Sequence, residues 1–390
     1  MAGKRPVYSI PVIVFLDDVS GNQSKQWNEH FSCYMSTGAL PREKLSEEFH
    51  VRFIATSPHA TPLEMMQGIR TSMEKTFQNP VEAYDCETKE EVLLQVYPLL
   101  FAGDNPMQSE LCSCAGLNAN HFCRTCMCGG TQEYKRSDEG FKSFFMLAEA
   151  SRSTGIKDHL AQPILDSIVK IGQDLRKATP DRAAVTPDVS LTETGVDIHK
   201  DTPTEILHTI LLGVVKYFWA QTTTLLEKDK KLGVFQSRLH SVEESGLNIP
   251  KLSAEYMCQY KGGLIGKHFK CLSQVMAFAV HGLVPQDVLD AWIVTGRMVV
   301  LLWHTEIENI DDYSRDLNQI ISNFLHITAK CSPSIIISKP KFHFLIHLVF
   351  YIRRFGPALL FSTERYESYN AVFRAASIHS NHQAPNRDIV

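Results

Sequence analysis

The sequence predicts an α/β protein in which a strand-rich N-terminal part precedes a long, mostly helical part. Apolar and β-branched segments typical of strands dominate the chain up to about residue 110. Between Ser137 and Leu345 the apolar residues instead recur every three to four positions, which is the period of an amphipathic helix. With 390 residues, 44% of them hydrophobic, the chain is long enough to form two or three domains.

The first predicted strand, Val7–Asp18, is apolar and β-branched and ends in two adjacent carboxylates, Asp17 and Asp18. Because successive side chains of a strand point to opposite faces, only one of these aspartates can belong to a site on one face. Two strands, an amphipathic helix and an apolar segment are expected next, at His30–Thr37, Phe49–Ser57, Thr61–Gln78 and Glu90–Leu100. The alternative interpretation of the aspartate pair is a turn cap.

The helical part is predicted from segments with a clear helical period: Phe141–Ser151, Ile156–Lys177, Pro203–Leu226, Lys267–His281, Pro285–Ile307 and Asp312–Ala329. A stretch rich in proline, threonine and aspartate, Thr179–Pro203, predicts a long loop. Near the C-terminus an apolar helix, Pro340–Arg354, is followed by a Gly-Pro break. A second helix begins after Ser362, which is a favourable N-cap residue.

Net charge and hydropathy exclude some classes of protein. The formal net charge of −4 argues against a simple nucleic-acid coat, so any DNA contact must come from a local basic patch. The longest apolar run, Ala291–Trp303, contains Arg297 and is too short to cross a bilayer. The N-terminal apolar run meets two aspartates and does not resemble a secretory leader. We therefore expect a soluble intracellular protein with no membrane partner.

A cysteine-rich loop between the two parts predicts a zinc site. Five of the ten cysteines fall within it, and Cys123-x-x-Cys126 provides half of a tetrahedral Zn²⁺ site. The other ligands are expected from Cys112, Cys114, Cys128 or His208. Glu205 and His208 share one helical face, so zinc on His208 would tie the helical part to the strand-rich part. The alternative is that His208 is a buried, hydrogen-bonded core residue.

A second pair of histidines, His343 and His347, has the i, i+4 spacing at which a helix can bind a metal ion. The segment between them contains no glutamate base of the kind found in the HExxH motif of metalloproteases. We therefore interpret both histidines as structural residues or as minor contacts to a substrate.

Acidic residues at the ends of predicted elements form a candidate magnesium site. Asp104 follows an apolar run and stands on a Gly-Asp-Asn-Pro turn, where a strand can present a metal ligand at its end. The last helix carries Glu364 and Glu367, which are three residues apart and can project from one face. With Asp17 or Asp18 they provide the hard oxygen ligands that two Mg²⁺ or Mn²⁺ ions require for phosphoryl transfer.

Basic residues surround the last carboxylates and are interleaved with aromatic ones. The basic set is Lys339, Lys341, Arg353, Arg354, Arg365 and Arg374, and the aromatic set is Tyr366, Tyr369 and Phe373. Such a pattern can hold a nucleic-acid backbone and stack on its bases, and Lys341, Arg365 and Arg374 are our candidates for these contacts. The alternative is a solvated helix face with its aromatic residues in the core.

Several stretches, spread over nearly the whole chain, carry a resemblance to a known family. They are FLDDVSGNQSKQWNEH, VRFIATSPHATPLEMM, FAGDNPMQSE, FCRTCMCGGTQEY, PTEILHTILLGVVKYFW, KPKFHFLIHL and FSTERYESYNAVFRAASIHSN. These stretches look like transposases of fungal DNA transposons, and most closely like those of the CACTA-like Plavaka elements of basidiomycetes. The resemblance implies a DDE catalytic core, with an RNase H-like mixed sheet interrupted by a long, mostly helical insertion.

The resemblance also implies domain boundaries and roles for single residues. It divides the chain into a first part of the core at 1–110, a cysteine-rich zinc-type loop at 111–135, a helical insertion at 136–345 and a C-terminal core helix at 346–390. It favours Asp18 as the first acid, because Asp18 precedes a Val-Ser-Gly-Asn turn as the aspartate of the plant relatives precedes their Gly-Phe-Asn. The second acid is Asp104, and the third is Glu364 with Glu367 close behind. The family's accessory Cys-x-x-Cys and acid-x-x-His motifs fall on Cys123, Cys126, Glu205 and His208.

The function implied by the resemblance is Mg²⁺- or Mn²⁺-dependent nicking of DNA at transposon ends. The freed 3′-hydroxyl then attacks a phosphodiester of target DNA, which joins the transposon strand to the target. The implied partners are DNA and further copies of the chain, and the implied location is the nucleus. The alternative is a catalytically inactive, truncated or domesticated zinc-stabilised DNA-binding protein derived from such an enzyme. A third class is a cysteine-rich structural domain. The enzyme requires Asp17 or Asp18, Asp104 and Glu364 or Glu367 to converge within a few ångströms, and scattered acids favour the other two classes.

Overall fold

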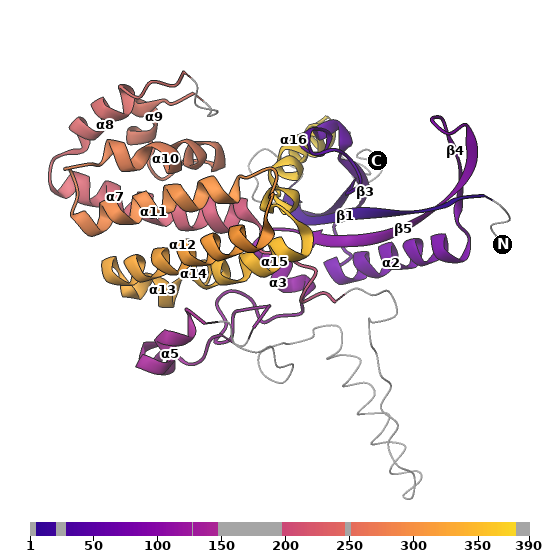
Figure 1. Cartoon of the computed structure of the whole chain (residues 1–390), viewed down its shortest axis with the longest axis horizontal. Coiled ribbons are helices and arrows are strands. Elements are labelled where there is room, and N and C mark those ends of the chain that lie inside the picture. Colours follow the sequence, from indigo (N-terminus) through magenta and orange to yellow (C-terminus); the bar gives the residue numbers. More distant parts are fainter. Residues whose placement is uncertain (1–4, 21–28, 127, 147–196, 246–250, 380–390) are drawn as a thin grey trace, which may run out of the picture. The chain divides into compact units, whose positions relative to one another are not determined.

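The structure, a computed structural model, describes residues 5–20, 29–126, 128–146, 197–245 and 251–379 (Figure 1). It is a mixed α/β protein, as the sequence predicts. The chain divides into two compact units: unit 1 is Met1–Met127, Ala150–Pro203 and Glu364–Val390, and unit 2 is Cys128–Glu149 and Thr204–Thr363. The predicted helix Ile156–Lys177 and most of the predicted loop Thr179–Pro203 lie outside the described residues.

Unit 1 is built on a five-stranded sheet. Its strands are β1 (Val7–Ser20), β2 (Glu29–Thr37), β3 (Arg52–Ser57), β4 (Val81–Asp85) and β5 (Glu90–Ala102), in the order β3-β2-β1-β5-β4. The pairs β1–β2, β2–β3 and β4–β5 are antiparallel, and β1–β5 is parallel. The two strands expected after the first are thus present as β2 and β3, which continue β1 as an antiparallel meander, and the edge strand β4 was not predicted. Short turns of helix, α1 (Arg42–Leu45) and η1 (Glu48–His50), connect β2 to β3.

One face of the sheet packs on α2 (Pro62–Gln78) and α3 (Asn105–Leu111). Val12, Val14 and Leu16 of β1 point to this face and form one apolar cluster with Met65 of α2 and Met107 of α3. The helix α2 begins with a capping box, in which the Glu64 amide donates to Thr61 Oγ1 at 3.3 Å and the Thr61 amide donates to the Glu64 carboxylate at 2.8 Å. Burial on both faces explains why β1 is an almost continuous apolar run.

The other face of β1 and β2 packs on α16 (Glu364–Ile378), so α2 and α16 lie on opposite sides of the sheet (Figure 1). Three aromatic contacts connect α16 to the sheet. The Tyr366 ring stacks on Phe15 with centroids 4.6 Å apart. Tyr369 meets Tyr34 edge-on at 5.1 Å, and Phe373 meets His30 at 5.9 Å. These residues of α16 recur at three and four positions and therefore share one helical face.

Unit 2 is helical throughout its described residues. Its elements are α4 (Gln132–Arg136), α5 (Asp138–Ser143), the π-helix η3 (Leu207–Val215), α7 (Lys216–Lys228), α8 (Leu232–His240), α9 (Ala254–Gln259), α10 (Gly266–Ala279), α11 (Gln286–Leu302), α12 (Ile310–Cys331), α13 (Pro333–Ser338), α14 (Lys341–Phe344), η4 (Leu345–His347), α15 (Leu348–Phe355) and η5 (Ala358–Phe361). The centre of its core is aromatic: the Phe218 ring lies 6.1 Å from Trp292 and 5.6 Å from Phe324, and Phe342 stacks on Phe324 at 6.0 Å.

The boundaries of the two units differ from the boundaries of the predicted domains. We expected the C-terminal part of the core to begin at residue 346, whereas unit 2 continues to Thr363. The reason is that α15 packs on α12 within unit 2. Arg353 of α15 donates to Ser314 Oγ at 3.0 Å and to Asp311 at 2.5 Å, and Leu348 and Ile352 are buried.

Within the described residues, none of the single helices is long and apolar enough to cross a membrane. The bent pair Lys341–Phe355 and Ala358–Ala376 meets the requirements of length and composition only when its two members are taken together.

Candidate acidic site and candidate metal site

The ends of two parallel strands bring Asp17 and Asp104 together in unit 1. Phe15 of β1 is paired with Ala102 of β5, and each aspartate follows two residues later. A Cβ atom on Gly103 would lie 3.2 Å from the Leu16 carbonyl oxygen, so the glycine permits the close approach of the two chains. Asp104 is also the N-cap of α3, because its Oδ1 accepts from the Met107 amide at 2.7 Å.

Asp17 and Asp18 lie on opposite faces of β1. Asp17 is only 7% exposed and points to the face that α16 covers, whereas Asp18 is exposed. The Asn370 amide of α16 donates from Nδ2 to Asp17 Oδ2 at 2.9 Å. The geometry therefore favours Asp17 over the preferred Asp18, because the aromatic contacts of α16 cover the face that Asp17 shares with Phe15.

Negative charge accumulates around Asp17. Burial raises the pKa of this carboxyl well above its usual range, and the carboxylates of Glu367, Asp104 and Asp18 raise it further, in that order. The hydrogen bond from Asn370 lowers the pKa and opposes this trend. Three acids on three elements thus act on one buried carboxyl, although no three acid side chains among the described residues bring their ligand oxygens within 4.8 Å of one another.

The glutamate that acts most strongly on Asp17 is Glu367, one turn after the preferred Glu364. The stack of Tyr366 on Phe15 and the hydrogen bond from Asn370 to Asp17 place α16 against β1, and Glu367 lies on the same helical face as Asn370. Glu364 is half-buried at the first position of the helix. The geometry therefore favours Glu367 as the third acid.

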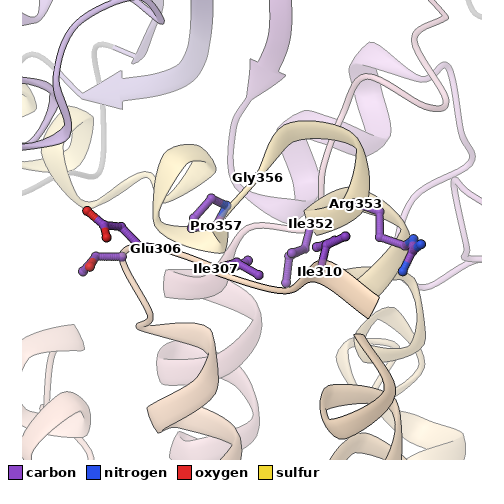
Figure 2. A pocket seen from close by; sticks show the side chains of 8 residues that line it. Glu306, Ile307, Ile310, Ile352, Arg353, Gly356 and Pro357 are labelled. Atoms are coloured by element: carbon purple, nitrogen blue, oxygen red, sulfur yellow. The ribbon is translucent and has the colours of Figure 1, made fainter. Parts of the chain in front are cut away.

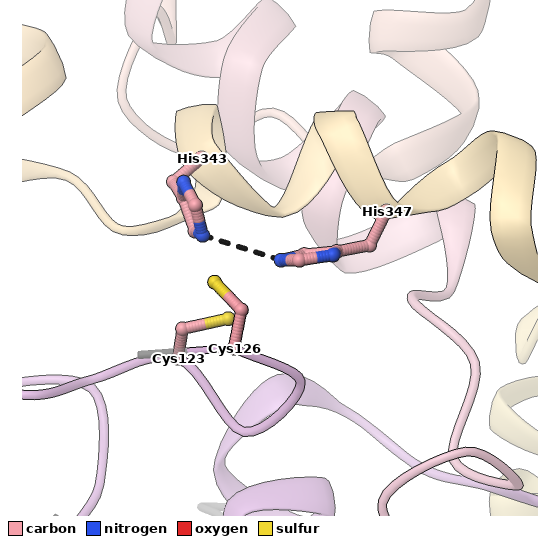
Figure 3. Close-up of side chains that lie close together, drawn as sticks. All are labelled: Cys123, Cys126, His343 and His347. Carbon is pink, nitrogen blue, oxygen red and sulfur yellow. Dashed lines mark hydrogen bonds between the residues drawn. The ribbon is translucent and has the colours of Figure 1, made fainter. Parts of the chain in front are cut away.

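A second group of side chains has the composition of a zinc site. Cys123, Cys126, His343 and His347 are all buried, and one ligand atom of each lies within 4.8 Å of the others (Figure 3). Over the described part of the chain, no other set of three or more cysteine, histidine or acidic residues is as close together, and the acids around Asp17 do not reach this closeness. The buried Cys2His2 group could hold a metal such as zinc.

The two histidines are prepared for metal binding within unit 2. The Nδ1 atom of His343 lies 3.1 Å from the Phe144 carbonyl oxygen, so Nδ1 carries the proton and Nε2 has a lone pair for a metal ion. The Nε2 atoms of His343 and His347 are 3.2 Å apart. Zinc–nitrogen bonds of about 2.0–2.1 Å in a tetrahedron separate two ligand nitrogens by roughly 3.3 Å. The pair thus belongs to a group that could hold a metal such as zinc, a role that the interpretation as structural residues or minor substrate contacts did not include.

Cys112 and Cys114, predicted as zinc ligands, are not members of the Cys2His2 group. The Cys112 thiol lies 3.2 Å from Thr202 Oγ1 and 3.6 Å from the Ile198 carbonyl oxygen, and the Cys114 thiol lies 3.6 Å from the Cys112 carbonyl oxygen. Burial would raise the pKa of Cys112, but hydrogen bonds with Cys114 and His199 lower it well below the usual range. The Cys112 thiol therefore contacts the segment before Pro203.

His208, the third predicted ligand outside the Cys-x-x-Cys pair, also lies outside the group. Its Nδ1 is 2.9 Å from Glu205 Oε1, and the Glu205 carboxylate also accepts from the Leu207 amide at 2.7 Å and from Thr363 Oγ1 at 3.2 Å. Glu205 is fully buried. The acid-x-x-His motif therefore caps the first turn of the π-helix η3, and its histidine is used as the partner of that carboxylate.

Two of the three basic candidates for DNA contacts lie within the fold. Arg365 is 8% exposed, and its guanidinium lies over the Tyr366 ring at 4.7 Å. Lys341 is half-buried, with its Nζ atom 3.5 Å from the Leu212 carbonyl oxygen. Arg374 is half-buried on α16. Arg365, a candidate for a DNA contact, is thus buried against an aromatic ring, and the alternative of aromatic residues in the core holds for Tyr366.

A surface hollow of about 480 Å³ lies in unit 2 (Figure 2). Ile307, Ile310 and Ile352 form its apolar part, and Glu306 and Arg353 are its charged residues. Arg353 of α15 already donates hydrogen bonds to Ser314 and Asp311 of α12. None of the residues predicted as site residues lines this hollow.

No protein-family model matches the chain, and no curated protein matches it. The geometry of the two sites and the resemblance of the sequence stretches are therefore the two grounds for assigning a function. Sequence reasoning missed Asn370, although it lies three residues after Glu367 and so on the same helical face. It also noticed the spacing of His343 and His347 without connecting them to the cysteine loop.

Proposed function

We propose that this chain is the catalytic core of a DDE-type DNA transposase, with an RNase H-like fold. The observation that carries the proposal is that Asp17 and Asp104 end two adjacent parallel strands in unit 1, with Glu367 of α16 among the charges that act on Asp17. They come from the first strand, from the end of the parallel strand beside it and from the last described helix. This is the distribution of acids that the transposase resemblance implies, and the topology of unit 1 supports it.

The residues around Asp17 fit divalent cations. Carboxylate oxygens are the ligands that Mg²⁺ and Mn²⁺ prefer, and a buried carboxyl beside three further carboxylates needs positive charge to be ionised. Asp17, Asp104 and Glu367 would hold the ions. When bound, two such ions activate a water or a 3′-hydroxyl and stabilise the leaving oxygen of an in-line displacement.

The chain's own residues supply position and rigidity. Asp104 is fixed by its hydrogen bond to the start of α3, and Asp17 by its hydrogen bond from Asn370. The Tyr366–Phe15 stack and the hydrogen bond from Asn370 hold α16 against β1, and Glu367 shares the helical face of Asn370. Holding the acids in place before substrate arrives lowers the reorganisation needed for phosphoryl transfer.

Zinc would have a structural role in the Cys2His2 group. Four protein ligands fill a tetrahedral site, whereas catalytic zinc keeps one position open for water or substrate. The proposal extends to DNA as the partner, both at transposon ends and at the target, to assembly with further copies of the chain, and to the nucleus as its location.

A second candidate function is favoured by one observation. The acids of unit 1 are less close together than the Cys2His2 group among the described residues, as a site without catalytic use would allow. The second candidate is therefore an inactive, zinc-stabilised DNA-binding protein derived from a transposase.

The experiment that separates these functions is nicking of plasmid DNA carrying the two genomic flanks of the coding sequence, in Mg²⁺ or Mn²⁺. Wild type is compared with Asp104→Asn, which retains a good N-cap for α3 and removes the charge. Asp18→Asn is the matched control, because Asp18 is exposed and projects from the opposite face of β1. Metal-dependent nicking that is lost only in Asp104→Asn supports the enzyme. DNA binding without nicking by wild type would support the second candidate.

A further inference from the structure

The helix α16 presents a second polar side chain to the acidic site. Asn370 follows Glu367 by three residues, so both project from the same side of the helix. Asn370 is only 1% exposed, and its Nδ2 donates to Asp17 Oδ2 at 2.9 Å. It is thus in direct contact with the carboxyl on which Glu367, Asp104 and Asp18 act.

The other end of this amide has an unsatisfied oxygen. Asn370 Oδ1 is buried and has no hydrogen-bond partner. Rotating the amide by 180° does not solve the problem, because Nδ2 would then take the unpaired buried position, and the oxygen would face an oxygen of Asp17 in the ionised form that binds a cation. Buried carbonyl oxygens are nearly always paired, so an unpaired one beside a cluster of acids indicates a missing ligand.

We propose that Asn370 is a fourth member of the acidic site: Nδ2 orients Asp17, and Oδ1 is a neutral oxygen ligand for the divalent cation held there. The inference rests on the proposed function, since it takes the acids to be a cation site. Amide oxygens are accepted ligands of hard divalent cations. A neutral ligand also adds coordination without adding to the repulsion among the carboxylates.

A purely structural role for Asn370 predicts something different. The amide would then only attach α16 to β1, and its loss would lower the stability of unit 1 without changing cation affinity. Cation affinity therefore distinguishes the two roles. Asn370→Leu removes both polar atoms at similar volume, and Asn370→Asp retains an oxygen at the position of Oδ1 while it removes the donor.

The test is Mn²⁺ binding by the full chain, measured by electron paramagnetic resonance of free Mn²⁺ after the Cys2His2 group has been saturated with Zn²⁺. Wild type, Asn370→Leu, Asn370→Asp and Asp17→Asn are compared, with circular dichroism to check that each variant is folded. We expect Asn370→Leu to weaken Mn²⁺ binding by roughly 10- to 100-fold, and Asn370→Asp to bind within about threefold of wild type or more tightly.

Two results would overturn the inference: an Asn370→Leu variant that binds within about twofold of wild type, or an Asn370→Asp variant as weak as Asn370→Leu. If Asn370→Leu does not fold, the comparison of Asn370→Asp with wild type decides by the same criterion. Failure of the proposed function gives a separate pattern, in which Asp17→Asn binds Mn²⁺ as wild type does.

Discussion

The stack of Tyr366 on Phe15 is the contact that sets α16 over the strand ends, and its strength can be measured. The rings are 4.6 Å apart and 10° from parallel, and both side chains are fully buried. Replacing either residue by leucine should lower the free energy of unfolding by about 1–3 kcal/mol. A stacked aromatic pair contributes about 0.5–1.5 kcal/mol beyond burial, so the double variant should be less destabilised than the sum by that amount.

The assay is a double-mutant cycle of Phe15→Leu and Tyr366→Leu in urea. Three of the four tryptophans belong to unit 2, so tryptophan fluorescence reports mainly on unit 2 and not on unit 1, which contains Phe15 and Tyr366. Hydrogen exchange of β1 peptides, read by mass spectrometry, reports on unit 1 instead. The control cycle combines Phe15→Leu with Ile69→Val of α2, which packs on the opposite face of the sheet. These two changes should be additive within about 0.5 kcal/mol.

A coupling between Phe15 and Tyr366 no larger than that of the control cycle would refute the reasoning. In that case α16 would not lie over Phe15, and the position of Glu367 beside Asp17 would lose its physical basis. A coupling in the expected range, together with loss of metal-dependent nicking in Tyr366→Leu, would connect the packing of the helix to the chemistry of the site.

Three further changes have definite expected results. The fold raises the pKa of Asp17, so ionisation of this carboxyl costs stability as pH rises above its pKa in the unfolded chain, about 3.9. Asp17→Asn should therefore raise the urea midpoint of unfolding at neutral pH in EDTA. An unchanged midpoint would contradict this expectation. Gly103→Ala should destabilise unit 1 by about 1–3 kcal/mol, because its Cβ would meet a β1 carbonyl at 3.2 Å. The control Gly68→Ala in α2, whose Cβ would meet nothing within 4 Å, should stabilise unit 1 by about 0.4–1 kcal/mol. Equal rates of amide hydrogen exchange in the two variants would contradict the close approach. Mass spectrometry of purified wild type should find one zinc ion per chain. His343→Ala should lose this zinc, and His208→Ala should retain it. The reverse pattern would support His208 as a ligand, as expected from the sequence.

Much of unit 1 follows from the sequence, because its elements have strong local signals. The apolar run of β1, its terminal aspartates and the capped helix α2 are all set by nearby residues. The choice between Asp17 and Asp18 could not be made in this way, since alternation separates their faces but does not say which face α16 covers. The exposed edge strand β4 has too little apolar content to be recognised.

The metal ligands were harder to predict than the strands. The cysteine pair and the histidine pair are separated by more than half of the chain, so no spacing rule connects them. His208 looked suitable because it shares a helical face with an acid, and this same acid is its hydrogen-bond partner. Arg365 illustrates a related failure: a basic residue between aromatic ones suggested a DNA contact, yet its guanidinium covers the Tyr366 ring.

The most direct test of the central claim is a crystal of the chain soaked in Mn²⁺ and measured for anomalous scattering. We expect a peak at a coordination distance of about 2.0–2.3 Å from carboxylate oxygens of Asp17 and Asp104, with Glu367 beside it. Anomalous density confined to the Cys2His2 group, with the three acids apart from one another, would contradict the assignment of a divalent-cation site to unit 1.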